Sequence, residues 1–153
     1  MDIEEAISFS QSFFKRTFDE EIPIRGAIGI GEFTYIPEKN LESFLTFGHG
    51  LILSSIVEKY HLKGHACLLI CENSPRNQHI YDRKYLEKYE HEDLPSKLLY
   101  FLLSWWDNSD EIKRIIDDRT HGLSCEDIIY LEKTRENLDH FKNKERIAGS
   151  DEW

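Results

Sequence analysis

Three glycines inside one apolar stretch constrain the fold of this chain more than any other feature. The stretch runs from Ile24 to Phe33, and its glycines are Gly26, Gly29 and Gly31. Glycine within a strand weakens it and commonly marks a bulge or a close approach by another backbone or a ligand. Dinucleotide and phosphate loops instead place their glycines between a strand and a helix. We therefore interpret Ile24–Phe33 as a strand packed closely in a sheet.

The segments that follow predict a hairpin and then a strand–helix–strand crossover. Ser43–Phe47 should return antiparallel to Ile24–Phe33 after a turn at residues 37–40. A change to helical periodicity then predicts a helix from about Gly48 to His61. Its buried stripe is expected at Leu51, Ile52, Ser55 and Ile56. A strand at His65–Cys71, apolar on both faces, follows, and the crossover into it should be right-handed.

Helices are expected at both ends of the chain. Asp2, with Glu5 three residues later, forms a capping box that begins a helix ending near Asp19. The segments Ser109–Arg119 and Ser124 to about Asn143 each begin with a capping residue. Residues 144–153 are expected to be a frayed tail.

The segment between the expected sheet and the C-terminal helices is harder to interpret. Tyr81–His91 has charged and aromatic residues at a helical spacing. Leu98–Trp106 is short, apolar and continuous, so it fits either a buried strand or a helix. We expect one domain over residues 1–153. Its parts are an N-terminal helix (1–19), a core (22–73), a mainly helical cover (80–143) and a tail (144–153).

Charge and cysteine content exclude several classes of function. The formal net charge is -10, with 29 acidic and 19 basic residues, which argues against binding to nucleic acid or to an anionic membrane surface. No apolar run reaches membrane-spanning length, and the N-terminus lacks the features of a signal peptide. The three cysteines show no paired spacing. These features together predict a reduced, cytoplasmic protein.

Alternate positions on the His65–Cys71 strand could hold a metal ion. His65, Cys67 and Cys71 would share one face of that strand. Structural zinc, however, takes four ligands from short turns, and buried free cysteine is far commoner. The seven histidines show no HExxH spacing. We therefore expect no metal site and no cofactor, and a hydrolase or metal-binding protein is the weakest hypothesis.

The core resembles the C-terminal half of a class III nucleotidyl (adenylate/guanylate) cyclase catalytic domain. The resemblance covers residues 22–73, roughly a third of the chain. A strand of the type RxGIxxG is matched by Arg25, Ile28 and Gly31, and a helix of the type GxxVNxAxRLE by Gly48, Leu51, Ser54 and Glu58. A group of prokaryotic cyclase-like proteins is still more similar. The resemblance implies an α+β fold, a truncated ferredoxin-like palm whose sheet is mostly antiparallel with one βαβ crossover and is covered by helices.

The same resemblance implies that the chain does not catalyse cyclisation. The family's transition-state Asn and Arg correspond to Ile52 and Ile56, and its purine-reading Asp corresponds to Leu45. The strands that carry the metal-binding aspartates would precede Met1 in the aligned family, and are expected to be absent. Phosphoryl chemistry of this type needs metal ions and positive charge at the phosphates. No catalytic residue is therefore assigned.

Besides the weak hypothesis of a hydrolase or metal-binding protein, the sequence leads to two hypotheses about function. The first is a non-catalytic cyclase-like domain that acts in protein–protein assembly, as a homodimer or with a protein partner, or binds a nucleotide without turnover. A partner is expected because the apolar surplus in Leu98–Trp106 and in the N-terminal Phe13, Phe14 and Phe18 exceeds what one small sheet needs. The candidate ligand-binding residues of this domain are Arg25, Glu32, Gly48 and His49. The alternative is one half of a two-chain cyclase, in which a separate polypeptide supplies the metal-binding aspartates and Mg²⁺ enters only with that partner.

Overall fold

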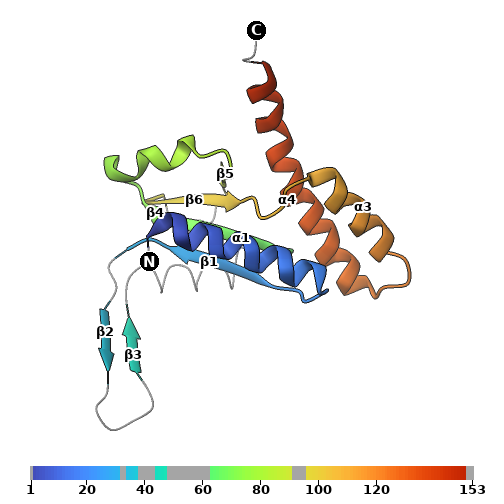
Figure 1. The fold of residues 1–153 in the computed structure, drawn as a ribbon, viewed down its shortest axis with the longest axis horizontal. Helices are drawn as coiled ribbons and strands as arrows, with labels where there is room; N and C mark the ends of the chain where they lie inside the picture. The colour runs from blue at the N-terminus through green and yellow to red at the C-terminus, as the bar shows by residue number, and fades with distance from the viewer. Residues whose placement is uncertain (1, 32–33, 38–43, 48–62, 91–95, 151–153) are drawn as a thin grey trace.

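A computed structural model describes residues 2–31, 34–37, 44–47, 63–90 and 96–150 (Figure 1). Its elements, in chain order, are α1 (Ile3–Asp19), β1 (Arg25–Gly29), β2 (Thr34–Pro37), β3 (Phe44–Phe47), β4 (Ala66–Glu72), the 3₁₀ helix η1 (Pro75–Asp82), β5 (Leu86–Lys88), β6 (Leu98–Leu103), α3 (Ser109–Arg119) and α4 (Cys125–Ser150).

The main sheet has four strands in the order β1-β4-β6-β5. The β1–β4 pair is parallel, and the β4–β6 and β5–β6 pairs are antiparallel. The two central strands, β4 and β6, are buried over almost their whole length, because both faces of the sheet are covered. The expected α+β fold with a mostly antiparallel sheet is confirmed at this level, and the parallel pair requires one crossover connection.

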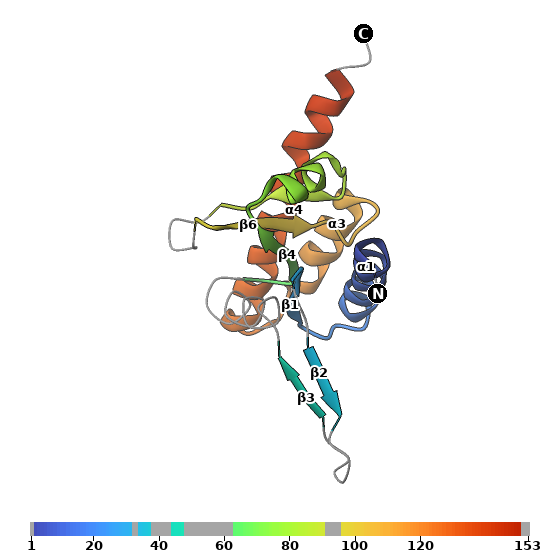
Figure 2. The ribbon, with the colours of Figure 1, turned by 90° about the vertical axis from the view of Figure 1, so that its left-hand side faces the viewer.

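Helix α1 packs on one face of this sheet, as both ribbon views show (Figures 1 and 2). Its capping box at Asp2 and Glu5 is formed as expected. Ile7, Phe14 and Phe18 point into the core. A Cβ added to Gly26 of β1 would lie 3.3 Å from the Phe14 ring. The glycine therefore leaves room for close packing of α1 on the sheet, and not for a ligand.

The predicted hairpin between Ile24–Phe33 and Ser43–Phe47 is wrong. Strand β1 ends at Gly29, and its partner in the sheet is β4. Just after β1, the Ile30 amide makes one more backbone hydrogen bond to β4, donating to the Ile70 carbonyl at 2.8 Å. The chain then bends at Gly31. Strand β3 pairs instead with β2 in a separate two-stranded ribbon, which extends away from the main sheet (Figure 2).

The crossover prediction is also corrected, because its first strand is β1 and not Ser43–Phe47. The helix expected at Gly48–His61 lies outside the described residues, so the structure does not test it.

Two further segments are strands. Leu98–Trp106, which the sequence left open, contains β6, and Leu98–Leu103 is buried throughout. The helical interpretation of Tyr81–His91 is wrong. Its first residues end η1, and Leu86–Lys88 forms β5, which pairs with the end of β6.

The C-terminal helices form close to where they were expected. Asn108, rather than Ser109, caps α3 by accepting from the amides of Asp110 and Glu111. Helix α4 continues to Ser150, beyond the predicted end near Asn143 and into the expected tail. It packs on the core through Phe141, whose ring meets Trp106 edge-on at 5.1 Å. None of the helices in the described part of the chain is long and apolar enough to span a membrane.

Candidate functional site

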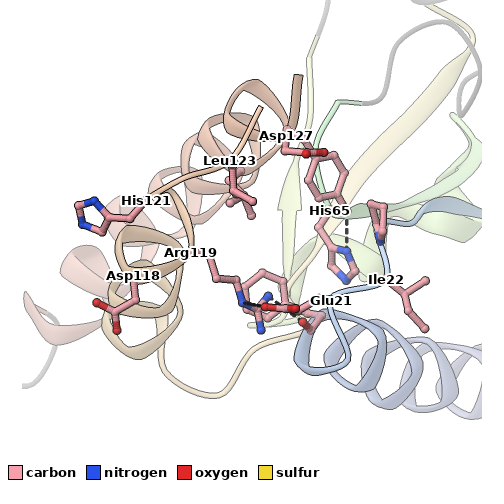
Figure 3. A pocket seen from close by; sticks show the side chains of 12 residues that line it. Glu21, Ile22, His65, Asp118, Arg119, His121, Leu123 and Asp127 are labelled. Atoms are coloured by element: carbon pink, nitrogen blue, oxygen red, sulfur yellow. Dashed lines mark hydrogen bonds and ion pairs between the residues drawn. The ribbon is translucent and has the colours of Figure 1, made fainter. Parts of the chain in front are cut away.

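A pocket of about 480 Å³ opens where the end of α1, the end of α3 and the start of α4 meet (Figure 3). Two connections contribute to it, the α1–β1 turn and the α3–α4 turn. Its lining residues are Phe18, Glu21, Ile22, Pro23, His65, Asp118, Arg119, His121, Leu123, Asp127, Tyr130 and Leu131. Most of the wall is apolar, and most of the charged side chains belong to the two turns and the adjoining helix ends.

His65 lies at the floor of the pocket and is 1% exposed. Its Nε2 is 2.7 Å from the Phe14 carbonyl oxygen, which can only accept, so Nε2 carries the hydrogen and donates. Its Nδ1 is 2.7 Å from the hydroxyl of Tyr130. That hydroxyl also accepts from the Ile24 amide at 3.1 Å. The chain of hydrogen bonds therefore joins α1, the α1–β1 turn, the start of β4 and α4.

Burial keeps His65 neutral. The pKa of His65 is lowered from 6.5 to about 4. Desolvation is the main cause, the hydrogen bond to the Phe14 carbonyl opposes it, and the nearby charge of Arg119 adds to the lowering. In the neutral ring Nδ1 is an acceptor, so Tyr130 donates its single hydroxyl hydrogen to Nδ1 at 2.7 Å rather than to the Ile24 carbonyl oxygen, which lies 3.2 Å away. A general base needs an available lone pair next to its substrate. His65 has both nitrogens occupied by protein groups, which makes it a structural residue.

Aromatic rings hold the imidazole in place. The centroids of Phe14, Phe18 and Trp105 lie 5.4, 5.5 and 4.9 Å from that of His65, each at a steep angle. The indole of Trp105 also donates to the His65 carbonyl oxygen at 3.1 Å. These contacts fix the floor of the pocket, so its shape does not depend on a bound ligand.

Arg119 forms one wall and is engaged by its neighbours. Its Nη1 donates to the Phe18 carbonyl at 2.8 Å, and its guanidinium lies 4.4 Å from the centre of the Phe18 ring. It also pairs with Glu21 at 3.4 Å. Asp118 and Asp127 add two carboxylates to the lining. The lining therefore holds three carboxylates and one arginine.

Of the four residues predicted from sequence, the structure describes only Arg25, and Arg25 does not line this pocket. Arg25 lies on β1 and lines a second, adjoining pocket of about 440 Å³ with Pro23, Ile24 and Tyr130. Glu32, Gly48 and His49 lie outside the described residues. The pocket itself was missed, because its walls come from two turns about a hundred residues apart and neither turn contains a recognisable motif.

The metal hypothesis for His65, Cys67 and Cys71 receives no support. No group of three potential metal ligands occurs among the residues that the structure describes. Cys67 and Cys71 are buried, unpaired thiols. Burial raises the pKa of Cys67 to about 12 and that of Cys71 to about 11, so neither forms a thiolate near neutral pH. Buried free cysteine, the commoner arrangement, is what the structure has.

Fold and pocket together define a small α+β domain with a mixed four-stranded sheet and a preformed surface pocket. A scan against protein-family models found no match, and searches of curated proteins and of solved structures found none either.

Proposed function

We propose that the chain is a non-catalytic binding domain, related in fold to the cyclase-like proteins, which holds a small ligand in the pocket at the ends of α1 and α3. One observation carries this proposal. The pocket is about 480 Å³ with largely apolar walls, and the buried histidine at its floor is hydrogen-bonded at both nitrogens. Ligand sites commonly have about this volume and wall character. The arrangement favours holding a molecule over transforming it.

The charges around the pocket indicate the class of ligand. Glu21, Asp118 and Asp127 oppose an anion, and Arg119 is paired with Glu21. A flat or branched apolar group with a neutral or protonated amine suits these surroundings better than a triphosphate does. Nucleotide binding through Arg25, Glu32, Gly48 and His49 stays a prediction from the resemblance, as does the two-chain cyclase. Among the described residues we find no observation that favours either over amine binding.

The proposal is tested by a matched ligand screen. Thermal shift and NMR titration would compare aromatic amines with aromatic carboxylates of the same size, and with ATP, GTP and cyclic nucleotides. Amines should bind more tightly than their carboxylate counterparts, and Asp118→Asn should reduce that preference. Leu123→Ser should weaken binding by about tenfold, the loss expected when a partly exposed leucine no longer contacts the ligand.

Ile129→Ser is the matched control for Leu123→Ser. Ile129 is also an exposed apolar residue near the start of α4, but it does not line the pocket. It should leave affinity unchanged. Equal weakening by both variants, or tight nucleotide binding displaced by no amine, would contradict the assignment.

A further inference from the structure

Two phenylalanines stand exposed on the outer face of α1. Phe9 is 65% exposed and Phe13 is 47% exposed. Their rings stack with centroids 6.0 Å apart and planes within 7°. Phe13 also meets the buried Phe14 edge-on at 6.1 Å, which ties the pair to the core. An exposed pair of large aromatic rings is a costly feature for a surface that only faces water.

Charged residues of opposite sign lie at the two ends of this pair of phenylalanines on α1. Glu5 lies one turn before Phe9, and Arg16 lies one turn after Phe13, so the four side chains follow one stripe of the helix. All four are exposed. We call this stripe, Glu5–Phe9–Phe13–Arg16, the α1 outer face. Its acidic end is at the helix N-terminus and its basic end is toward the C-terminus.

We propose that the α1 outer face is a dimer interface, and that a second copy of this chain packs on it antiparallel about a two-fold axis. Such an axis between Phe9 and Phe13 places Phe9 of each copy against Phe13 of the other. Glu5 is then about 9 Å along the helix from the axis and Arg16 about 7.5 Å. Each Glu5 therefore lies beside the other copy's Arg16, which also pairs with Glu20 of its own helix at 3.0 Å. A parallel pairing would oppose Glu5 with Glu5.

Of the other exposed large apolar residues that the structure describes, Ile22 and Leu123 line the ligand pocket and Ile129 lies on α4. The apolar run Leu98–Trp106 suggested an interface from sequence, yet its large side chains are buried within the chain. Phe14 and Phe18 are buried as well. Phe13, the remaining phenylalanine of that apolar surplus, is exposed and stacks against Phe9 on the surface of α1. The interface lies on the opposite side of α1 from the His65 contacts, so it is independent of the proposed ligand pocket.

One helix face is a small interface, so the dimer should be weak and reversible. Light scattering and sedimentation velocity would follow the mass over concentrations on the order of 10 to 500 µM. The average mass should rise from 18.1 kDa toward twice that value. The double variant Phe9→Ser, Phe13→Ser should stay monomeric throughout. Ile129→Ser, which removes another exposed apolar side chain, should dimerise like the unmodified chain.

Charge reversal tests the antiparallel register. Arg16→Glu should weaken dimerisation at least tenfold, because each new carboxylate faces the other copy's Glu5. Glu5→Lys alone measures the loss of the capping-box hydrogen bond to the Asp2 amide, with helix content followed by circular dichroism. Adding it to Arg16→Glu should restore dimerisation above the level of either single variant. A mass that stays at 18.1 kDa at every concentration overturns the proposal. So does a dimer that survives Phe9→Ser, Phe13→Ser, or a double charge reversal that dimerises no better than Arg16→Glu alone.

Discussion

His65 is a polar side chain inside an apolar core, and its hydrogen bonds make this burial tolerable. A buried polar group without partners costs about 1–3 kcal/mol, whereas one with partners costs little. Tyr130 and the Phe14 carbonyl satisfy the ring, and Thr134 Oγ1 accepts from the His65 amide at 2.8 Å. Aromatic side chains surround the His65 ring, and they would solvate a protonated, positively charged imidazole poorly. The folded state therefore selects the neutral form.

Acidification should destabilise the protein through His65. Between pH 6.5 and about 4 the unfolded chain binds a proton on this histidine that the folded chain does not bind. The stability present above pH 6.5 should fall as the pH drops toward 4, by up to about 3 kcal/mol. Urea unfolding at a series of pH values from 7 to 4.5 measures this change.

His65→Asn provides the comparison for this pH dependence. It should lower stability at pH 7, because it loses ring packing, but it should flatten the dependence between pH 7 and 4.5. The other histidines are present in both proteins and cancel in the difference. Identical pH dependence in both proteins would show that His65 does not titrate as argued.

The role of His65 could not be predicted from sequence. Alternation along the strand placed it with Cys67 and Cys71, which suggested a metal site. Its actual partner, Tyr130, lies 65 residues away on α4. The sequence pattern of α4 marks its apolar stripe but cannot show which residue of another element meets a tyrosine hydroxyl. Long-range polar pairing of this kind depends on how the helix packs on the sheet.

At the scale of elements, local chemistry predicted the helices well and the strand pairing poorly. The capping box of α1 and the position of α3 involve residues close together in sequence, and both are confirmed. The pairing of Ile24–Phe33 with Ser43–Phe47 assumed that chain neighbours pair in the sheet. The bend at Gly31 breaks that assumption, and β1 lies beside β4 instead.

A single glycine sets the approach of α4 to β4. Gly64 has φ +75°, and a Cβ there would lie 2.6 Å from the Thr134 amide nitrogen of α4. Gly64→Ala should therefore cost about 1–2 kcal/mol for the backbone conformation and more for displacing the helix. Gly122 has φ +83° and nothing within 4 Å of its would-be Cβ. Gly122→Ala should cost the conformational part alone.

Chemical denaturation of the two glycine variants separates these contributions. The excess loss for Gly64→Ala over Gly122→Ala reports the contact between α4 and the start of β4. Equal losses would mean that the helix does not pack as closely as the structure has it.

At the scale of the whole molecule, the chain buries its own apolar surplus. The expectation that Leu98–Trp106 and the N-terminal phenylalanines need a partner was based on counting apolar residues. Much of that surface is covered internally by α1, α4 and the central strands. Composition gives the amount of apolar surface, but only the three-dimensional arrangement shows which part stays exposed. Phe9, which was not among those phenylalanines, is the most exposed large hydrophobic residue in the part of the chain that the structure describes.

The purified chain, assayed with ATP or GTP and Mg²⁺ or Mn²⁺, should form no cyclic nucleotide. The reason comes from side-chain chemistry at the positions that match the cyclase helix. Ile52 and Ile56 can neither donate a hydrogen bond nor carry charge, whereas the transition state of phosphoryl transfer requires both metal ions and fixed cationic donors.

An active cyclase domain assayed in parallel would establish the detection limit. Cyclic product that follows the protein through successive purification steps would contradict the non-catalytic assignment. Activity that appears only when a second, aspartate-bearing chain is added would instead favour the two-chain cyclase. In that case Ile52 and Ile56 would have to lie away from the reacting phosphates, because neither side chain can stabilise charge there.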